Sequence, residues 1–324
     1  MKRVGLRTLL GIFAVCSIVS GPVFAQAYPS QPIKLVVPWP PGGLTDAIGR
    51  TIGHSLSERL GQSVIVENKP GASGNIGTAQ FARTKPDGYT LLLGSSTTNA
   101  ANPHLYSQLG FDPLKDFAPI GLIASAPNVF LVAANSPYKN VQQVIDAAKA
   151  KPNKLTYGSA GSASSAHLAG AMFTRMTDVE MMHVPYKGAG PALVDLMAGH
   201  IDLMLDPSAL QHIKSGKLRA LAVPSKMRLP ALPDVPTFEE ATGMKNMYAY
   251  AWYGLMAPAG TPPDIVNRLN HELNAVLQTP EIRARLIDAG AEIGGGTAEE
   301  LRRFMANELD RYGNIVKISG AKVD

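Results

Sequence analysis

Four segments rich in glycine and hydroxyl side chains could bind an anion. Each follows a short apolar run and precedes a stretch with helical periodicity, and they cover residues 38–46, 94–99, 158–165 and 185–190. The free N–H groups at a helix start carry a partial positive charge and attract anions. Glycine lets the backbone approach a ligand closely, and serine and threonine add hydroxyl donors. The four segments therefore predict main-chain and hydroxyl binding of a negatively charged ligand.

Any one of these segments could also be an ordinary turn with a helix N-cap. One helix terminus contributes at most about 2 kcal/mol, whereas micromolar binding requires about 8 kcal/mol. Several segments must therefore converge, with charge-assisted hydrogen bonds supplying the remainder.

Two further side chains could take part in chemistry. Asp206 follows the apolar run 201–205, where it could accept a hydrogen bond from a ligand hydroxyl or ammonium, or cap the next turn. His167 lies next to Ser164 and Ser165, so a Ser/His hydrolase pair is one alternative, and a packed histidine is the other.

Motifs of the common enzyme classes are missing from the sequence. It contains no G-x-S-x-G, no Walker A motif and no H-E-x-x-H, and its seven histidines are scattered. We therefore expect neither catalysis, nor a metal ion, nor a cofactor.

The N-terminus is typical of a secretory signal. Lys2, Arg3 and Arg7 precede an apolar stretch of residues 9–19, and Ala25 ends a segment with small residues at the cleavage positions. Cleavage before Gln26 would lower the formal net charge from +5 to +2 and remove the only cysteine. These features predict a periplasmic protein without a nucleic-acid partner.

The remaining chain alternates short apolar runs with amphipathic helical periods. This pattern is typical of α/β folds with mostly parallel sheets that helices cover on both faces. A length of 324 residues suggests about two domains. The segment 127–247 has its own set of strands and helices, so we expect residues 26–126 and 248–324 to form one lobe around it. Two crossing strands would then place a cleft between the lobes.

An ordered series of motifs resembles the Bug family, the periplasmic solute receptors of tripartite tricarboxylate transporters. The series begins with Y-P-x-x-P-I-K-L-V-V-P at residues 28–38, which runs into P-G-G-x-x-D at residues 41–46. It continues with V-E-N-K-P-G-A-x-G at residues 66–74, H-V-P-Y-K-G at residues 183–188 and A-P-x-G-T-P at residues 257–262. The matches cover essentially the whole mature chain.

The resemblance implies a two-lobed, type II-like periplasmic binding protein that closes around a small organic acid. Such a receptor is not an enzyme and delivers its ligand to the transporter in the inner membrane. We expect a monomer. The resemblance, together with the loop chemistry above, gives these candidate ligand-binding residues: Pro41, Gly42, Gly43, Thr45, Asp46, Ser96, Thr97, Asn99, Ser159, Ala160, Ser162, Ser164, His167, Tyr186, Lys187, Gly188 and Asp206.

Several points stay open at this level. Family members often carry histidine where this chain has Thr98 and Asn99, and no arginine can be assigned to the cleft. Aromatic acids, amino acids and citrate-like acids all fit the same loops, and Trp39 and Tyr186 could stack on an aromatic ring. A hydrolase and a ligand-sensing module for a receptor kinase are the alternative functions.

Overall fold

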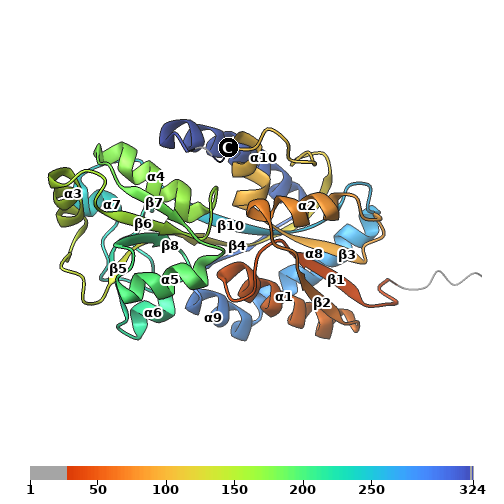
Figure 1. Cartoon of the computed structure of the whole chain (residues 1–324). Coiled ribbons are helices and arrows are strands. Elements are labelled where there is room, and N and C mark those ends of the chain that lie inside the picture. Colours follow the sequence, from red (N-terminus) through yellow and green to blue (C-terminus); the bar gives the residue numbers. More distant parts are fainter. Residues whose placement is uncertain (1–27, 322, 324) are drawn as a thin grey trace, which may run out of the picture.

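The computed structural model describes residues 28–321 and residue 323, so the predicted signal sequence lies outside the described residues. The described residues form two halves that long strands connect (Figure 1). We call the half with the six-stranded sheet lobe 1 and the half with the five-stranded sheet lobe 2. The predicted α/β architecture of two helix-flanked sheets is confirmed.

Lobe 1 has the strand order β11-β4-β10-β3-β1-β2. Its strands are β1 (Ile33–Val37), β2 (Val64–Asn68), β3 (Thr90–Ser95), β4 (Phe117–Pro127), β10 (Tyr250–Pro258) and β11 (Glu292–Gly295). Its helices are α1 (Leu44–Leu60), α2 (Asn75–Ala82), α8 (Pro263–Gln278), α9 (Pro280–Asp288) and α10 (Ala298–Ser319). Helices α1, α8 and α9 cover one face of the sheet, and α2 and α10 cover the other.

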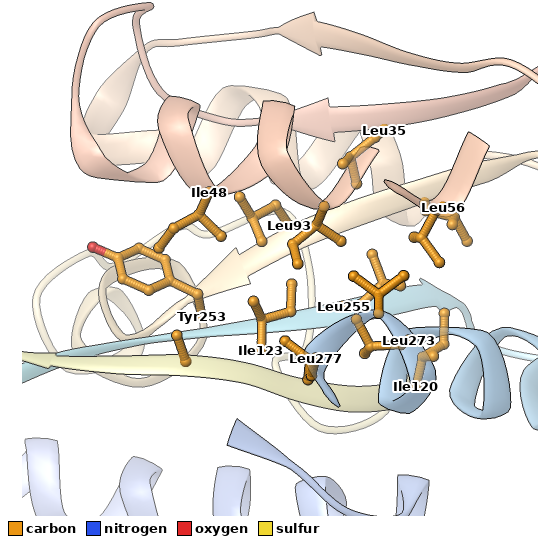
Figure 2. Close-up of a cluster of buried hydrophobic side chains, with 14 of the residues drawn as sticks. Leu35, Ile48, Leu56, Leu93, Ile120, Ile123, Tyr253, Leu255, Leu273 and Leu277 are labelled. Carbon is orange, nitrogen blue, oxygen red and sulfur yellow. The ribbon is translucent and has the colours of Figure 1, made fainter. Parts of the chain in front are cut away.

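The core under α1 and α8 fixes the position of the first candidate loop. Ile48 and Leu56 on α1 pack against Leu35 and Leu93 of the sheet, and Leu273 contributes from α8 (Figure 2). All of these side chains are essentially inaccessible to water. Because interiors pack densely, the start of α1 is held rigidly relative to β1.

Lobe 2 has the strand order β7-β6-β8-β5-β9. Its strands are β5 (Val129–Ala133), β6 (Thr156–Ser159), β7 (Met182–Pro185), β8 (Leu203–Asp206) and β9 (Leu218–Ala222). Its helices are α3 (Val141–Ala150), α4 (Ser165–Thr177), α5 (Ala189–Ala198), α6 (Leu210–Lys214) and α7 (Phe238–Thr242). Helices α3, α4 and α7 pack on one face, and α5 and α6 pack on the other.

Both sheets are mixed, so the prediction of mostly parallel sheets is wrong. In lobe 1, β10 runs antiparallel to β3 and β4, and β11 runs antiparallel to β4. In lobe 2, β5 runs antiparallel to β8 and β9. Strand β4 escaped prediction because Pro119 and Gly121 interrupt its apolar run, and its pairing partner lies more than 120 residues away in sequence.

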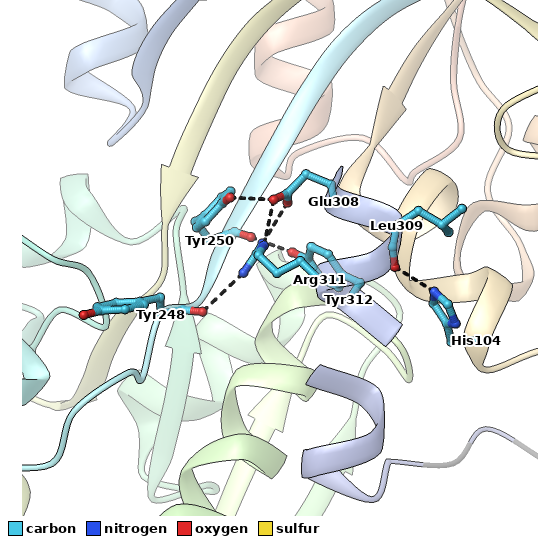
Figure 3. Close-up of polar contacts among 7 residues, drawn as sticks. All are labelled: His104, Tyr248, Tyr250, Glu308, Leu309, Arg311 and Tyr312. Carbon is cyan, nitrogen blue, oxygen red and sulfur yellow. Dashed lines mark hydrogen bonds and ion pairs between the residues drawn. The ribbon is translucent and has the colours of Figure 1, made fainter. Parts of the chain in front are cut away.

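The two lobes are linked where β4 continues into β5 and where the chain returns into β10. The two links lie side by side, because the Asn128 N–H donates to the Ala249 carbonyl at 3.0 Å. Helix α10 holds this region (Figure 3): the Tyr250 hydroxyl donates to Glu308 at 2.7 Å, and the Tyr312 hydroxyl donates to the Tyr250 carbonyl at 2.6 Å. Arg311 pairs with Glu308 and covers the Tyr250 ring. A hinge of paired strands therefore positions the loops that face each other across the cleft.

Candidate functional site

A cleft lies between the lobes, where carboxyl ends of strands from both sheets meet. Its inner chamber has a cavity volume of about 80 Å³ and is lined by residues that follow β1, β3, β6, β7 and β8. An outer chamber of about 630 Å³ adjoins it. Trp39, Pro40, Ala160, Lys187 and Gly188 line both chambers. The cleft is therefore continuous, with a small inner end and a larger outer part.

Three helices begin at the inner chamber. Their N-caps, Gly43 of α1, Ser164 of α4 and Gly188 of α5, all line it. First-turn N–H groups of a helix have no partner within the helix. Two lobes thus aim helix N-termini at one small volume, which is the convergence that anion binding by main-chain groups requires.

The loop of residues 38–46 is held by an ion-pair network behind the chamber. The Asp46 carboxylate accepts hydrogen bonds from the Gly42 N–H at 3.0 Å, from Arg50 Nε at 3.1 Å and from Asn68 Nδ2 at 3.0 Å. Burial opposes its ionisation, but these hydrogen bonds outweigh burial and lower the pKa of Asp46. Asp46 and Gly42 do not line the chamber. Asp46 therefore shapes the loop that carries Gly43 and Thr45.

The end of β3 contributes hydroxyl groups from lobe 1. Ser95, Ser96 and Thr97 line the inner chamber, and the π-helical turn η2 (Thr97–Ala101) starts there. Ser96 Oγ is buried and accepts or donates no hydrogen bond of good geometry among the described residues. Asn99 lies behind the chamber, where its Oδ1 accepts from the Thr98 hydroxyl at 2.8 Å.

In lobe 2, two neutral histidines hold the loop of residues 159–165. His183 Nε2 lies 2.7 Å from Ser159 Oγ, and His167 Nδ1 accepts from the Ala163 N–H at 3.1 Å. The two imidazole rings stack with centroids 4.0 Å apart. Burial lowers the pKa of His167 to about 4, and burial with the neighbouring His167 lowers the pKa of His183 to about 3. Ser159 and His167 support the loop and do not line the inner chamber.

The geometry of a Ser/His hydrolase is missing from the described part of the chain. The Ser164 hydroxyl accepts from the His167 backbone N–H at 3.2 Å and does not contact the imidazole. Ser159 does meet His183, but it is fully buried and donates to the Gly161 carbonyl. No acidic residue orients either ring among residues 28–321.

The loop of residues 185–190 forms part of the lobe 2 wall of the cleft. The Gly188 N–H donates to the Ala160 carbonyl at 3.1 Å, which ties this loop to the neighbouring one. The Tyr186 hydroxyl donates to Asp195 at 2.6 Å, so its ring is fixed against the outer chamber. Lys187 is exposed and is the one cationic residue that lines either chamber within residues 28–321.

The floor of the inner chamber includes groups that the sequence did not indicate. Asp206 lines it and also caps the turn at Ser208, and both Ser208 and Tyr253 of β10 line the same chamber. Tyr253 pairs with Ser95 of β3, which lies more than 150 residues earlier in the chain, so its place in the site depends on long-range pairing. Burial raises the pKa of Tyr253 and keeps its hydroxyl protonated.

The candidate residues fall into three groups. Those that line the inner chamber are Pro41, Gly43, Thr45, Ser96, Thr97, Ala160, Ser164, Lys187, Gly188 and Asp206. Those that line only the outer chamber are Ser162 and Tyr186. Those that line neither chamber are the buried Asp46, Asn99, Ser159 and His167 and the exposed Gly42. Ligand contact by any of them stays a prediction.

No group of three or more His, Cys, Asp or Glu residues within the described chain is arranged to hold a metal ion. None of the described helices has the length and apolar character of a membrane span.

Comparison with known proteins supplies independent evidence. The model of the tripartite tricarboxylate transporter family receptor matches residues 48–321. Protein BugT of Bordetella pertussis is 36% identical over the full length of both chains. The UPF0065 protein of the tcbD-tcbE intergenic region of Pseudomonas sp. strain P51 is 38% identical and covers 98% of this chain and 95% of its own length.

Solved structures agree with the sequence matches. R. palustris Rpa4515 with adipate has a TM-score of 0.88 and 36% identity, and the match covers 91% of this chain and 100% of that one. MatC from Rhodopseudomonas palustris with bound malate has a TM-score of 0.84 and 32% identity, with 89% and 100% covered. The periplasmic binding protein BugD has a TM-score of 0.85 at 36% identity, with 91% and 99% covered. The predicted two-lobed periplasmic binding protein fold is confirmed.

Proposed function

The chain belongs to the tripartite tricarboxylate transporter family of solute receptors, as its motifs predicted, and we propose that it binds a small dicarboxylate between its lobes. One observation carries the proposal: the N-termini of α1, α4 and α5 converge on a chamber of about 80 Å³ with little cationic charge in its wall. The adipate and malate in the solved relatives support this ligand class.

The energetics favour binding by several hydrogen bonds over binding by one ion pair. Each charge-assisted hydrogen bond contributes about 1.5–3 kcal/mol, and each helix terminus adds up to about 2 kcal/mol when partly buried. Four or five N–H and hydroxyl donors reach the roughly 8 kcal/mol of a micromolar ligand. Gly43, Thr45, Ser96, Ser164 and Gly188 are the residues we assign to this role.

Closure of the two lobes would exclude water and strengthen these hydrogen bonds. We place the lobe boundaries at 126/127 and 247/248, next to the paired links at Asn128 and Ala249. The closed surface would then dock on the membrane subunits of the transporter. For export to the periplasm we propose cleavage after Ala25, and N-terminal sequencing of the secreted protein should begin at Gln26.

The ligand class is tested by thermal unfolding against succinate, L-malate and adipate, with the corresponding neutral diamides as matched controls. A ligand at 100 times its dissociation constant adds about 2.7 kcal/mol, which raises the melting temperature by several degrees. Stabilisation by a dicarboxylate and none by its diamide is the expected result. Equal stabilisation by both, or by a sugar alone, would overturn the proposal.

A further inference from the structure

Asp206 is a buried acidic group in the wall of a chamber that we assign to anions. It ends β8, it is 3% exposed, and it lines the inner chamber. Its Oδ1 atom accepts from the Ser208 backbone N–H at 2.8 Å and also from the Ser208 hydroxyl. Its Oδ2 atom accepts no hydrogen bond from the described residues. Half of this carboxyl group is therefore free to contact whatever occupies the chamber.

The surroundings of Asp206 do not compensate its charge. The described residues provide no ion pair to it, and Lys187, the one cation of the described cleft wall, is exposed on the neighbouring loop. Tyr253 faces the same chamber from lobe 1 with a neutral hydroxyl. Two carboxylates placed close together in a water-poor site repel each other. Burial raises the pKa of the Asp206 carboxyl, so a ligand that offered only carboxylate oxygens could occupy the chamber only if this group took up a proton.

A hydrogen-bond donor on the ligand would offset the repulsion between Asp206 and the ligand carboxylate. We propose that Asp206 selects carboxylates that also carry a hydrogen-bond donor, an ammonium or a hydroxyl group, which its free Oδ2 accepts. The helix N-termini hold the carboxylate, and Asp206 recognises the donor. This inference rests on the proposed function and narrows its ligand class. A role limited to capping the turn at Ser208 would use only Oδ1 and would not discriminate among ligands.

The test compares acids that differ only in the donor. Succinate, L-malate and L-aspartate share four carbons and two carboxyl groups, and adipate and L-2-aminoadipate form a longer pair. Isothermal titration at pH 7.5 should show that a donor-bearing acid binds at least tenfold tighter than its plain diacid. Preference for aspartate or aminoadipate identifies an ammonium ligand, and preference for malate identifies a hydroxyl.

Two variants separate recognition from folding. Asp206→Asn keeps an acceptor for Ser208 but removes the charge, so the preference should disappear and the plain diacids should bind more tightly. Ser208→Ala weakens the cap and keeps the carboxyl group, so the preference should persist. Should Asp206→Asn fail to fold, the wild-type ranking alone decides.

The inference is overturned if the wild-type protein binds plain and donor-bearing acids with equal affinity. It is also overturned if Asp206→Asn changes all affinities by one common factor. If none of these acids binds, the proposed function itself fails, and this inference fails with it.

Discussion

Each wall of the cleft carries a loop that a network of side chains supports, but the network is charged in lobe 1 and neutral in lobe 2. In lobe 1, the loop of residues 38–46 is held by an ionised carboxylate, Asp46, with Arg50 and Asn68. In lobe 2, the loop of residues 159–165 is held by two stacked neutral imidazoles, His167 and His183. Both networks lie behind their loops. The Arg50 guanidinium is paired with the Asp46 carboxylate, and both imidazoles are uncharged.

This difference shows two ways of supporting a loop so that its main-chain N–H groups remain the main anion-binding groups of the cleft. A loop needs rigid support to hold its N–H groups in place, but a free cation in the wall would compete with them for an anion. Lobe 1 neutralises its cation with Asp46, and lobe 2 uses support without charge. The two walls must therefore respond differently to acid.

Acidification should produce the largest effect and should act on lobe 2 first. The pKa of His167 is lowered from 6.5 to about 4 and that of His183 to about 3, so the unfolded chain binds more protons than the folded chain between pH 6.5 and 4. The free energy of unfolding should therefore fall as the pH falls through this window, by about 2–4 kcal/mol between pH 7 and 4.5. Urea denaturation as a function of pH measures it.

The double variant His167→Gln, His183→Gln is the control for this pH dependence. Its stability should change little between pH 6.5 and 4.5. The Asp46 network responds only at lower pH, because a carboxyl with a lowered pKa loses its stabilisation below the ordinary value of 3.8. An unchanged pH dependence in the double variant would show that other groups sense the acid.

Removal of the lobe 1 support should have the next largest effect. Asp46→Ala leaves the Gly42 N–H without an acceptor and removes one of the two acceptors of Asn68 Nδ2, which still donates to the Trp39 carbonyl. Arg50, which is 56% exposed, can regain water. We expect a loss of about 2 kcal/mol in the free energy of unfolding and at least tenfold weaker dicarboxylate binding. Asp46→Asn, which keeps one acceptor, should lose less of both. Unchanged affinity in Asp46→Ala would remove this loop from the site.

Removal of the lobe 2 support should cost somewhat less. His183→Ala deletes one stacked ring and the contact with Ser159 Oγ, so we expect a loss of about 1–2 kcal/mol. His54 is exposed on α1 and serves as the matched control, and His54→Ala should change stability by less than about 0.5 kcal/mol. Equal effects at the two positions would contradict a supporting role for His183.

Much of the site could be predicted because its chemistry is local in sequence. A glycine or serine between a strand and a helix indicates an N-cap, and Gly43, Ser164 and Gly188 all have this position and line the chamber. The direction of a first-turn side chain is not local. Asp46 and His167 lie one turn into their helices and point behind the loops, because partners from other segments, Asn68 and His183, hold them there.

The fold also combines features that local sequence predicts with features that depend on distant segments. Apolar runs indicated the strands that β1, β5 and β8 form, whereas β4 and the mixed sheet order depend on pairing with β10. Tyr253 joins the inner chamber only through that pairing, and no nearby sequence pattern marks it as a site residue.

The most direct test of anion binding by main-chain groups uses Lys187, the one cation that lines the described cleft. Isothermal titration should compare the wild-type protein with Lys187→Met, using the tightest binder among succinate, L-malate and adipate. Because the side chain is exposed and screened by salt, its removal should change the dissociation constant by no more than about threefold. A hundredfold loss of affinity would contradict the account and assign the anion to a lysine ion pair.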